Sequence, residues 1–216
     1  MIDLHTHTLF SDGALLPSEL VRRAEVKGYT AIALTDHVDS SNIDFVIPRL
    51  VGVCKDLNKH WKICSIPGCE ITHAPVEDIK GLVKRARKLG AKIVVVHGET
   101  ISEPVIVGTN RSAIDAGCDI LAHPGLITEE DVRLAKSRGV CLEITARPSH
   151  RKTNKRLVKL ALPIGAKLVL DTDGHSDEDF ISDKEASSIL KKLGLSPLQA
   201  KKVFDNSRLL AKKACS

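Results

Sequence analysis

The 216-residue sequence predicts an α/β protein built as a TIM-like barrel of seven βα units. Three observations support this fold class. Short apolar runs alternate with longer amphipathic segments at a spacing of roughly 30 residues, which is typical of a parallel sheet. The short runs are apolar on both faces, as expected for strands covered on both sides. Polar residues follow the ends of these runs, and similar pairs follow the first and the last of them.

Seven short apolar runs predict the strands of the barrel. In chain order they are Ile2–His5, Thr30–Thr35, Lys62–Ile66, Lys92–Val96, Asp119–Ala122, Val140–Ile144 and Lys167–Leu170. An open doubly wound sheet fits this alternation nearly as well as a barrel does. An open sheet, however, would leave the first and last strands at opposite edges, whereas a barrel brings them together.

Amphipathic segments between these runs predict the helices. They are Pro17–Lys27, Ile43–Lys59, Val76–Leu89, Asn110–Ala116, Thr128–Ser137 and Asn154–Leu162, with two closing helices at Asp177–Leu193 and Pro197–Lys213. Pro17 suits a first helical turn, and Gly90 follows a helix where a left-handed cap is expected. No linker or low-complexity stretch interrupts the pattern, so we expect one domain over residues 1–216.

Composition narrows the classes of partner. The chain is 43% hydrophobic and 27% charged, and aromatic residues are so few that the core must be aliphatic. Aromatic residues do not alternate with basic ones, as they do in many RNA-binding domains. A net charge of +5 suits a small anionic molecule as well as a polyanion. Nucleic acid is therefore a partner that we do not favour.

The chain carries no membrane or export signal that we recognise. Asp3, His5 and His7 interrupt any apolar start, and no apolar run reaches the length of a membrane span. The six cysteines form no C-x-x-C motif, and several lie within apolar runs. We therefore expect buried free cysteines rather than disulfides, and a cytoplasmic protein.

Potential metal ligands follow nearly every predicted strand. Six of the nine histidines share this position, together with several carboxylates: His5, His7, Asp12, His37, Glu70, His97, His123, Asp173 and His175. Residues two apart on a strand point the same way, so His5 and His7 can contact one ion. The pair Asp173 and His175 repeats that spacing after the last strand.

The carboxyl ends of parallel strands meet at one face of a barrel, where the active sites of such barrels lie. Imidazole and carboxylate ligands suit Zn, Mn or Fe better than Mg or Ca. This many ligands exceeds what one four-coordinate ion needs, so two or three divalent ions are expected. The ligand pairs after the first and last predicted strands can meet at one site only if the sheet closes. This pattern therefore favours a closed or nearly closed barrel.

These motifs resemble the PHP (polymerase and histidinol phosphatase) family of metal-dependent phosphoesterases. The order H-x-H, S-D-G, T-D-H, P-G-x-E, H-G-E, A-H-P-G and T-D-x-H runs through the whole chain. The resemblance implies a distorted seven-stranded barrel with three ions. One ion would be bound by His5, His7, Glu70 and Asp173, and Glu70 would bridge to a second ion bound by His97 and His123. The third would be bound by Asp12, His37 and His175, although some family members carry His at the Asp12 position.

Substrate-binding candidates lie in the loop after the sixth predicted strand. Arg147 can bind two oxygens of a phosphate, and His150 or Lys152 can assist it. A weaker candidate for binding an anion is the helix start at residues 108–111. Asp36 and Glu99 are each adjacent to a predicted ligand and are candidates to orient an imidazole.

The expected activity is hydrolysis of a small-molecule phosphate monoester by a metal-bound hydroxide held at His5, His7, Glu70 and Asp173, with histidinol phosphate the nearest family substrate. Members assigned that reaction are commonly longer, so nucleotides or oligonucleotide ends are the alternative substrates. A non-catalytic RNA-binding subunit of the ribonuclease P type is a further alternative, although it lacks the ligands found here. An amidohydrolase-type barrel that cleaves C–N bonds also begins with H-x-H, but its pattern is fitted poorly by Glu70 and by the group of Asp12, His37 and His175.

Overall fold

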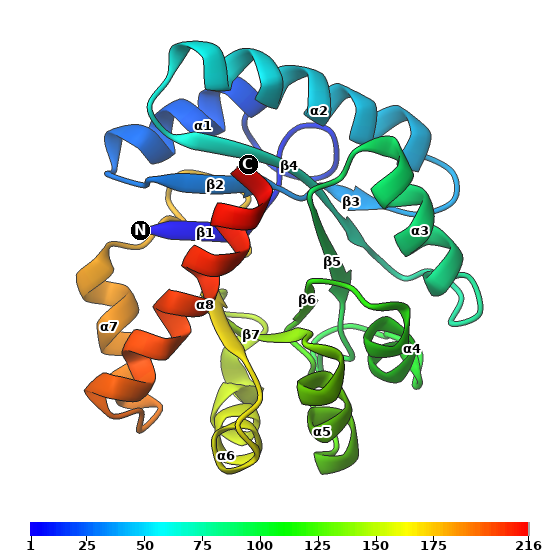
Figure 1. The fold of residues 1–216 in the computed structure, drawn as a ribbon, viewed down its shortest axis with the longest axis vertical. Coiled ribbons are helices and arrows are strands. Elements are labelled where there is room, and N and C mark those ends of the chain that lie inside the picture. The colour runs from blue at the N-terminus through cyan, green and yellow to red at the C-terminus, as the bar shows by residue number, and fades with distance from the viewer. Residues whose placement is uncertain (216) are drawn as a thin grey trace.

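A computed structural model describes residues 1–215 and shows a ring of parallel strands with helices around it (Figure 1). The neighbouring strands follow the order β1-β2-β4-β5-β6-β7-β8, and β3 pairs with β4 beside this path. The strand bounds are β1 Ile2–Thr6, β2 Ala31–Leu34, β3 His37–Val38, β4 Cys64–Ile71, β5 Ile93–His97, β6 Ile120–Ala122, β7 Cys141–Thr145 and β8 Leu168–Asp171. The predicted seven-stranded TIM-like barrel is confirmed, with the short β3 as an addition.

Helices alternate with the strands as predicted and cover the outside of the ring. They are α1 Pro17–Val26, α2 Ile43–His60, α3 Ile79–Leu89, α4 Thr109–Ala116, α5 Glu129–Arg138, α6 Asn154–Ile164, α7 Asp183–Lys192 and α8 Pro197–Cys215, with a 3-10 turn at Arg151–Thr153 before α6. Gly90 caps α3 in the left-handed conformation at φ 104°, as its position predicts. Helix α7 begins later than predicted, because Ser182 and Glu185 form a capping box there.

The barrel is closed where β1 meets β8, largely by side chains. Only one isolated bridge, between Thr6 and Gly174, joins the two segments. Beside it, Asp171 Oδ1 accepts a hydrogen bond from Leu4 N at 2.8 Å, and Asp3 Oδ2 accepts one from Thr172 Oγ1 at 2.6 Å. Buried carboxylates thus replace part of the missing backbone ladder, and both ends of the chain reach one site.

Strand β4 extends beyond its predicted end. Pro67 and Gly68 resemble a strand terminus in sequence, yet they pair with Leu34 and Ile93 of the neighbouring strands. A Cβ at Gly68 would lie 2.7 Å from Ile93 O, so this position needs glycine for a close approach of the backbones. Glu70 therefore lies inside a strand, where its backbone is fixed on both sides, rather than in a loop.

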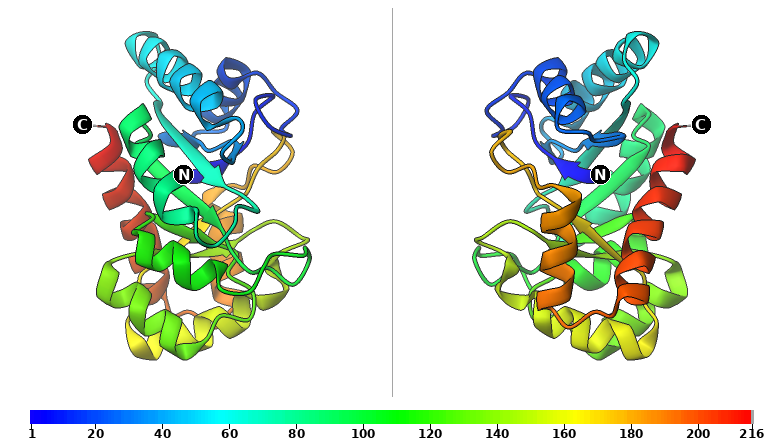
Figure 2. Two further views of the ribbon diagram at one scale, coloured as in Figure 1. Left: turned by 90° about the vertical axis from the view of Figure 1, so that its right-hand side faces the viewer. Right: turned by 90° about the vertical axis from the view of Figure 1, so that its left-hand side faces the viewer.

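The amino-terminal end of the barrel is apolar and is covered by α8 (Figures 1 and 2). A core cluster fills the barrel there, and Leu210 and Ala214 of α8 pack against it. Cys215 at the end of α8 forms a disulfide with Cys64 at the start of β4. The expectation of free cysteines is therefore wrong for this pair, whereas the other four cysteines are free and buried as predicted.

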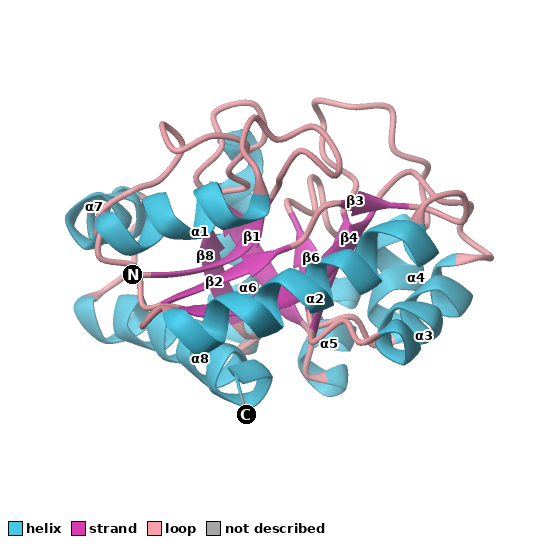
Figure 3. Cartoon of the chain, turned by 90° about the horizontal axis from the view of Figure 1, so that it is seen from above, coloured by secondary structure: helices cyan, strands magenta, loops and turns pink. Residues whose placement is uncertain are grey.

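Most of the longer loops lie on one side of the molecule, away from α8 (Figure 3). These loops follow the carboxyl ends of the strands, where the candidate ligands were predicted. Within residues 1–215, no helix combines the length and apolar character needed to cross a membrane.

Candidate metal centre

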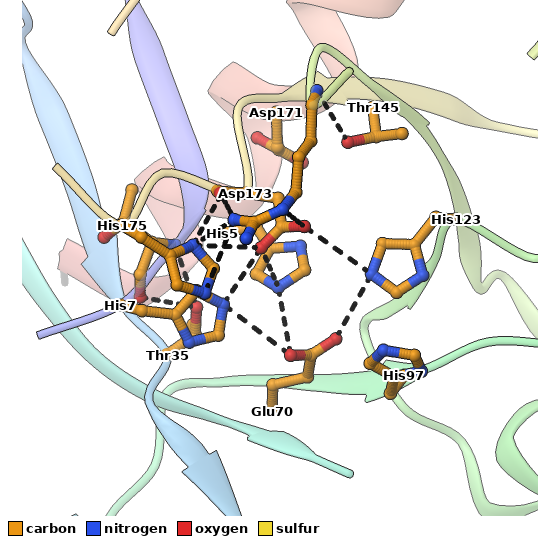
Figure 4. Close-up of polar contacts among 12 residues, drawn as sticks. His5, His7, Thr35, Glu70, His97, His123, Thr145, Asp171, Asp173 and His175 are labelled. Carbon is orange, nitrogen blue, oxygen red and sulfur yellow. Dashed lines mark hydrogen bonds and ion pairs between the residues drawn. The ribbon is translucent and has the colours of Figure 1, made fainter. Parts of the chain in front are cut away.

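The predicted ligands converge at the carboxyl ends of the strands, as Figure 4 shows for most of them. His5 lies in β1 and His7 directly follows that strand, and both side chains are fully buried. His5 Nε2 lies 3.3 Å from Glu70 Oε2, and His7 Nε2 lies 3.2 Å from Asp173 Oδ1. Strands β1 and β4 and the loop after β8 therefore bring these four side chains together.

A second group of candidate ligands lies on the other side of Glu70. His123 Nε2 is 3.6 Å from Glu70 Oε1, and ligand atoms of Glu70, His97 and His123 lie within 4.8 Å of one another. His97 is the last residue of β5, and its Nδ1 lies 3.1 Å from Gly98 O. Its Nε2 is therefore the ring nitrogen that remains for a metal ion. Glu70 thus faces both groups with its two carboxylate oxygens, as a bridging ligand would.

Asp12, His37 and His175 form a third group near the cleft surface. Asp12 Oδ1 lies 3.5 Å from His37 Nε2, and Asp12 Oδ2 lies 3.1 Å from His175 Nε2. His7 belongs to the same group, since ligand atoms of all four residues lie within 4.8 Å of one another. Asp12 is exposed to solvent, with 55% of its side chain accessible. All nine predicted ligands are thus near one another.

Unpaired buried atoms test whether this cluster fits metal ions. Among residues 1–215, the side-chain atoms that are buried without a hydrogen bond of acceptable geometry belong mostly to the predicted ligands: His5 Nε2, both ring nitrogens of His7, both carboxylate oxygens of Glu70, and His123 Nδ1. Leaving such atoms unpaired in a protein interior is costly. A set of imidazole nitrogens and carboxylate oxygens facing one another fits divalent ions such as Zn, Mn or Fe.

The electrostatics of the cluster keep several of its groups in the form that binds metal. Burial lowers the pKa of His7 to about 4, so its imidazole is neutral at neutral pH. Burial opposes ionisation of Glu70, but His5 and His37 outweigh it and hold the pKa of that carboxyl well below its usual range. Neutral imidazoles and ionised carboxylates are the protonation states that metal ligands require.

His37 differs from His7 in its charge. Burial favours the neutral imidazole, but Glu70 and Asp12 lie close enough to raise the pKa of His37 to about 10. His37 Nδ1 is 2.8 Å from Glu70 Oε2. In the absence of a cation, a protonated His37 therefore balances part of the negative charge of these carboxylates, and an entering ion would replace its proton.

Sequence reasoning missed Glu143, which lies directly behind His5. Glu143 Oε2 is 2.6 Å from His5 Nδ1, and both side chains are wholly buried. A hydrogen bond from Nδ1–H to a carboxylate fixes the tautomer and leaves Nε2 as a metal ligand. The available signal was a single acidic residue inside the apolar run at residues 140–144.

The two carboxylates that were predicted to orient an imidazole have other contacts. Asp36 accepts hydrogen bonds from Thr8 and Ser11, and it thereby fixes the loop after β1. Glu99 Oε1 accepts hydrogen bonds from the backbone N–H groups of Gly108 and Asn110 at the start of α4. These predictions are therefore wrong, and the anion site proposed at residues 108–111 already has an internal carboxylate.

The substrate-binding candidates divide into two kinds. Arg147 and His150 line a cleft of about 410 Å³ that also contains several predicted ligands. Arg147 Nη1 donates to Asp173 O at 2.8 Å and contacts His175, and its side chain is 30% exposed. Lys152 is exposed on the 3-10 turn and does not line this cleft, so the structure does not bring it to the site.

The chain is similar in sequence to several known proteins, and two of these relatives differ widely in how much of the chain they cover. An uncharacterized protein of Methanocaldococcus jannaschii is 45% identical over 209 residues, which cover 96% of this chain and 94% of the relative. A 3',5'-nucleoside bisphosphate phosphatase of Chromobacterium violaceum is 33% identical over 107 residues, which cover 43% of this chain and 38% of the relative. The first relative shows that the likeness extends over nearly the whole chain.

Several solved structures share the fold, among them the following two. A chain from archaeal ribonuclease P with mature tRNA superposes with a TM-score of 0.75 at 19% identity, covering 98% of this chain and 90% of that one. Histidinol phosphate phosphatase from Lactococcus lactis, complexed with Zn, L-histidinol and phosphate, superposes with a TM-score of 0.63 at 18% identity, covering 90% and 94%. At these identities the two likenesses concern the fold.

The family assignment rests on motifs, fold and a family match together. The sequence pattern of the PHP domain matches residues 3–98, which contain the first six predicted ligands. The remaining three ligands follow β6 and β8, and the structure places them beside the first six. This chain belongs to the PHP domain family.

Proposed function

We propose that the protein is a metal-dependent phosphoesterase that hydrolyses a small-molecule phosphate monoester. The observation that carries this proposal is the meeting of nine imidazole and carboxylate side chains at the base of a cleft. A cleft of about 410 Å³ suits a small substrate. Membership of the PHP family supports a phosphatase-type enzyme, and the substrate itself is our proposal.

The side chains would divide the binding of two or three divalent ions among them. His5, His7, Glu70 and Asp173 would hold one ion, and Glu70 would share a second with His97 and His123. Asp12, His37 and His175 would hold the third. Ions bound there supply an activated water and positive charge that offsets the charge of the phosphate. Glu143 would accept the Nδ1–H of His5 and thereby leave Nε2 to bind an ion.

Arg147 is the candidate phosphate ligand of the chain itself. Its guanidinium reaches the cleft between Asp173 and His175, beside two of the predicted metal ligands. A planar guanidinium can donate two parallel hydrogen bonds to phosphate oxygens. His150 lines the same cleft and can donate a further hydrogen bond to the substrate. Substrate binding would thus place the phosphate against the metal ligands.

A second candidate function is phosphatase or exonuclease activity on nucleotides or oligonucleotide ends. The partial likeness to a nucleoside bisphosphate phosphatase favours it. The cleft offers one arginine, and its remaining wall includes Asp39, which would repel an additional phosphate. We therefore favour a monophosphate over a substrate with several phosphates. A non-catalytic role in RNA binding is a weaker alternative, because the complete ligand set has no use in it.

The test is a hydrolysis assay of protein loaded with Mn²⁺ or Zn²⁺. The substrates would include histidinol phosphate, sugar phosphates, nucleoside monophosphates, nucleoside bisphosphates and short oligonucleotides, with His5→Ala protein as the inactive control. We expect phosphate release from at least one monophosphate by the wild-type protein only. Equal release by His5→Ala protein, or no release from any ester by metal-loaded protein, would refute the proposal.

A further inference from the structure

Two residues outside the family motifs lie beside the predicted metal ligand His97. His73 follows the end of β4, and Glu103 lies in the loop between β5 and α4. Glu103 Oε2 is 3.1 Å from His73 Nε2 and 3.2 Å from His97 Nε2. Two imidazoles, one in the loop after β4 and one at the end of β5, thus face the same carboxylate oxygen, in the cleft that holds the predicted cluster.

The other oxygen of Glu103 faces a third imidazole. Glu103 Oε1 lies 3.4 Å from His150 Nε2, while His150 Nδ1 lies 2.8 Å from Thr100 Oγ1. His150 is nearly buried, and its ring stacks on that of His123 with centroids 4.4 Å apart. Glu103 is therefore held in the cleft from two sides, although it belongs to a largely exposed loop.

Backbone strain marks His73 independently of these contacts. In the part of the chain that the structure describes, three non-glycine residues have a positive φ: His73 at 50°, His123 at 26° and Asp173 at 53°. This conformation is unfavourable for residues with a Cβ and is concentrated at functional sites. The other two residues are predicted metal ligands, so His73 shares a rare feature with them.

We propose that His73, His97 and Glu103 form an outer site for a divalent cation at the mouth of the cleft. One ligand atom from each of the three residues lies within 4.8 Å of the others. Two imidazoles and one carboxylate make a ligand set suited to Zn, Mn or Fe. The proposal rests on the proposed metal centre, because His97 is also a predicted ligand there.

The outer site lies between solvent and the buried ligands. The side chains of His73 and Glu103 are 43% and 38% exposed, whereas that of His97 is 3% exposed. An ion that enters the cleft can therefore meet His73 and Glu103 before it reaches Glu70 and His123. The Nε2 atom of His97 binds one ion at a time, so the outer site competes with the inner position for this ligand. The ion at His97 is consequently the one that exchanges most readily with solvent.

The experiment titrates chelator-stripped protein with Co²⁺ or Zn²⁺ alone, and follows Co²⁺ absorption and calorimetric heat. His73→Ala and Glu103→Gln are compared with His60→Ala and Glu77→Gln, which change exposed residues that do not line the cleft. We expect both cleft variants to lose affinity for the weakest-bound ion by about 10- to 100-fold, without change in the tighter ions. The two control variants should titrate like the wild-type protein.

His73→Asn guards against a folding artefact, because Asn tolerates a positive φ better than most residues. It should also weaken the ion while leaving the thermal midpoint within the range of the controls. Wild-type titration curves in His73→Ala and Glu103→Gln proteins would overturn the outer site. These titrations need no substrate, so they test the outer site even if the hydrolysis assay fails. Conversely, the protein can hydrolyse a phosphate ester even if the outer site does not exist.

Discussion

The two ends of the barrel differ in the chemistry of the side chains that fill them. At the amino-terminal end, aliphatic side chains fill the interior, α8 covers them, and the Cys64–Cys215 disulfide fastens the helix. At the carboxyl-terminal end, imidazoles and carboxylates are buried with several atoms left without a hydrogen bond. The first end contributes stability, while the second leaves polar groups unpaired that cations can satisfy. Substitutions at the amino-terminal end should therefore leave metal binding intact, and substitutions at the carboxyl-terminal end should leave the stability of the fold intact.

The largest effect is expected from His7→Ala at the carboxyl-terminal end. His7 faces both Glu70 and Asp173, so its loss should reduce hydrolysis by about 10²- to 10³-fold or more and release at least one ion. Its ring nitrogens have no hydrogen bonds to lose, so the metal-free variant should remain folded. Activity, metal content and urea denaturation check this. Full activity with fewer ions would contradict it.

Ile66→Ala provides the converse test at the amino-terminal end. Ile66 is fully buried in the apolar cluster at the amino-terminal end of the barrel. Its truncation leaves a cavity that should lower the free energy of unfolding by about 2–5 kcal/mol. The number of bound ions should not change, since Ile66 belongs to an apolar cluster that contains none of the candidate ligands. Urea denaturation beside metal analysis measures both properties. Loss of metal at unchanged stability would show that the two ends are not separate.

Arg147→Ala distinguishes substrate binding from metal binding within the carboxyl-terminal end. We expect KM to rise by about 10- to 100-fold, because the variant loses charge-assisted hydrogen bonds to phosphate. Metal content should stay at the wild-type value. Lys152→Ala is the matched control, because Lys152 is a nearby cation that lies outside the cleft. An unaltered KM in the Arg147 variant would remove this residue from the proposed site.

Cys215→Ser tests how much the disulfide contributes to the amino-terminal end. A crosslink that closes a loop of this length restricts the unfolded chain, so its loss should cost about 2–5 kcal/mol. Reduction of the wild-type protein should have a similar effect. Hydrolysis by folded protein should be unchanged, since the disulfide lies at the opposite end from the cleft. Equal denaturation midpoints with and without reductant would contradict the assignment.

The smallest effect concerns the four free cysteines. Burial raises the pKa of the Cys54 and Cys141 thiols to about 12 and also raises the pKa of Cys69 and Cys118. A raised pKa keeps a thiol protonated, and therefore unreactive, up to alkaline pH. Folded oxidised protein should react with a thiol reagent at pH 8 only after unfolding. Rapid labelling of any of the four in native protein would show an opening of the core.

The fold and the predicted ligands could be inferred from sequence because both depend on regular spacing. Apolar runs mark the strands, and a parallel arrangement places every strand end at one face, so His5 and Asp173 could be brought together from 168 residues apart in the sequence. The continuation of β4 through Pro67 could not be inferred, because residues that usually end a strand are accommodated here by two neighbours.

Contacts between side chains of separate segments were the least predictable part. Nothing in the local sequence shows that Glu143 meets His5, or that Glu103 meets His73, since these pairs depend on the packing of different loops and strands. The disulfide was missed for a similar reason, because only the path of α8 brings Cys215 to Cys64. Proximity in sequence misled us for Asp36 and Glu99, whose carboxylates turn toward backbone and hydroxyl groups instead.

Counting the ions in the protein tests the central claim most directly. Stripped protein would be reloaded with excess Zn²⁺ or Mn²⁺, freed of loosely bound metal, and measured by native mass spectrometry. The account predicts two or three ions per chain in the wild-type protein and at least one fewer in the His7→Ala variant. A wild-type protein that retains no ion, or one whose ion count is unchanged by His7→Ala, would contradict the assignment of the buried cluster as a metal centre.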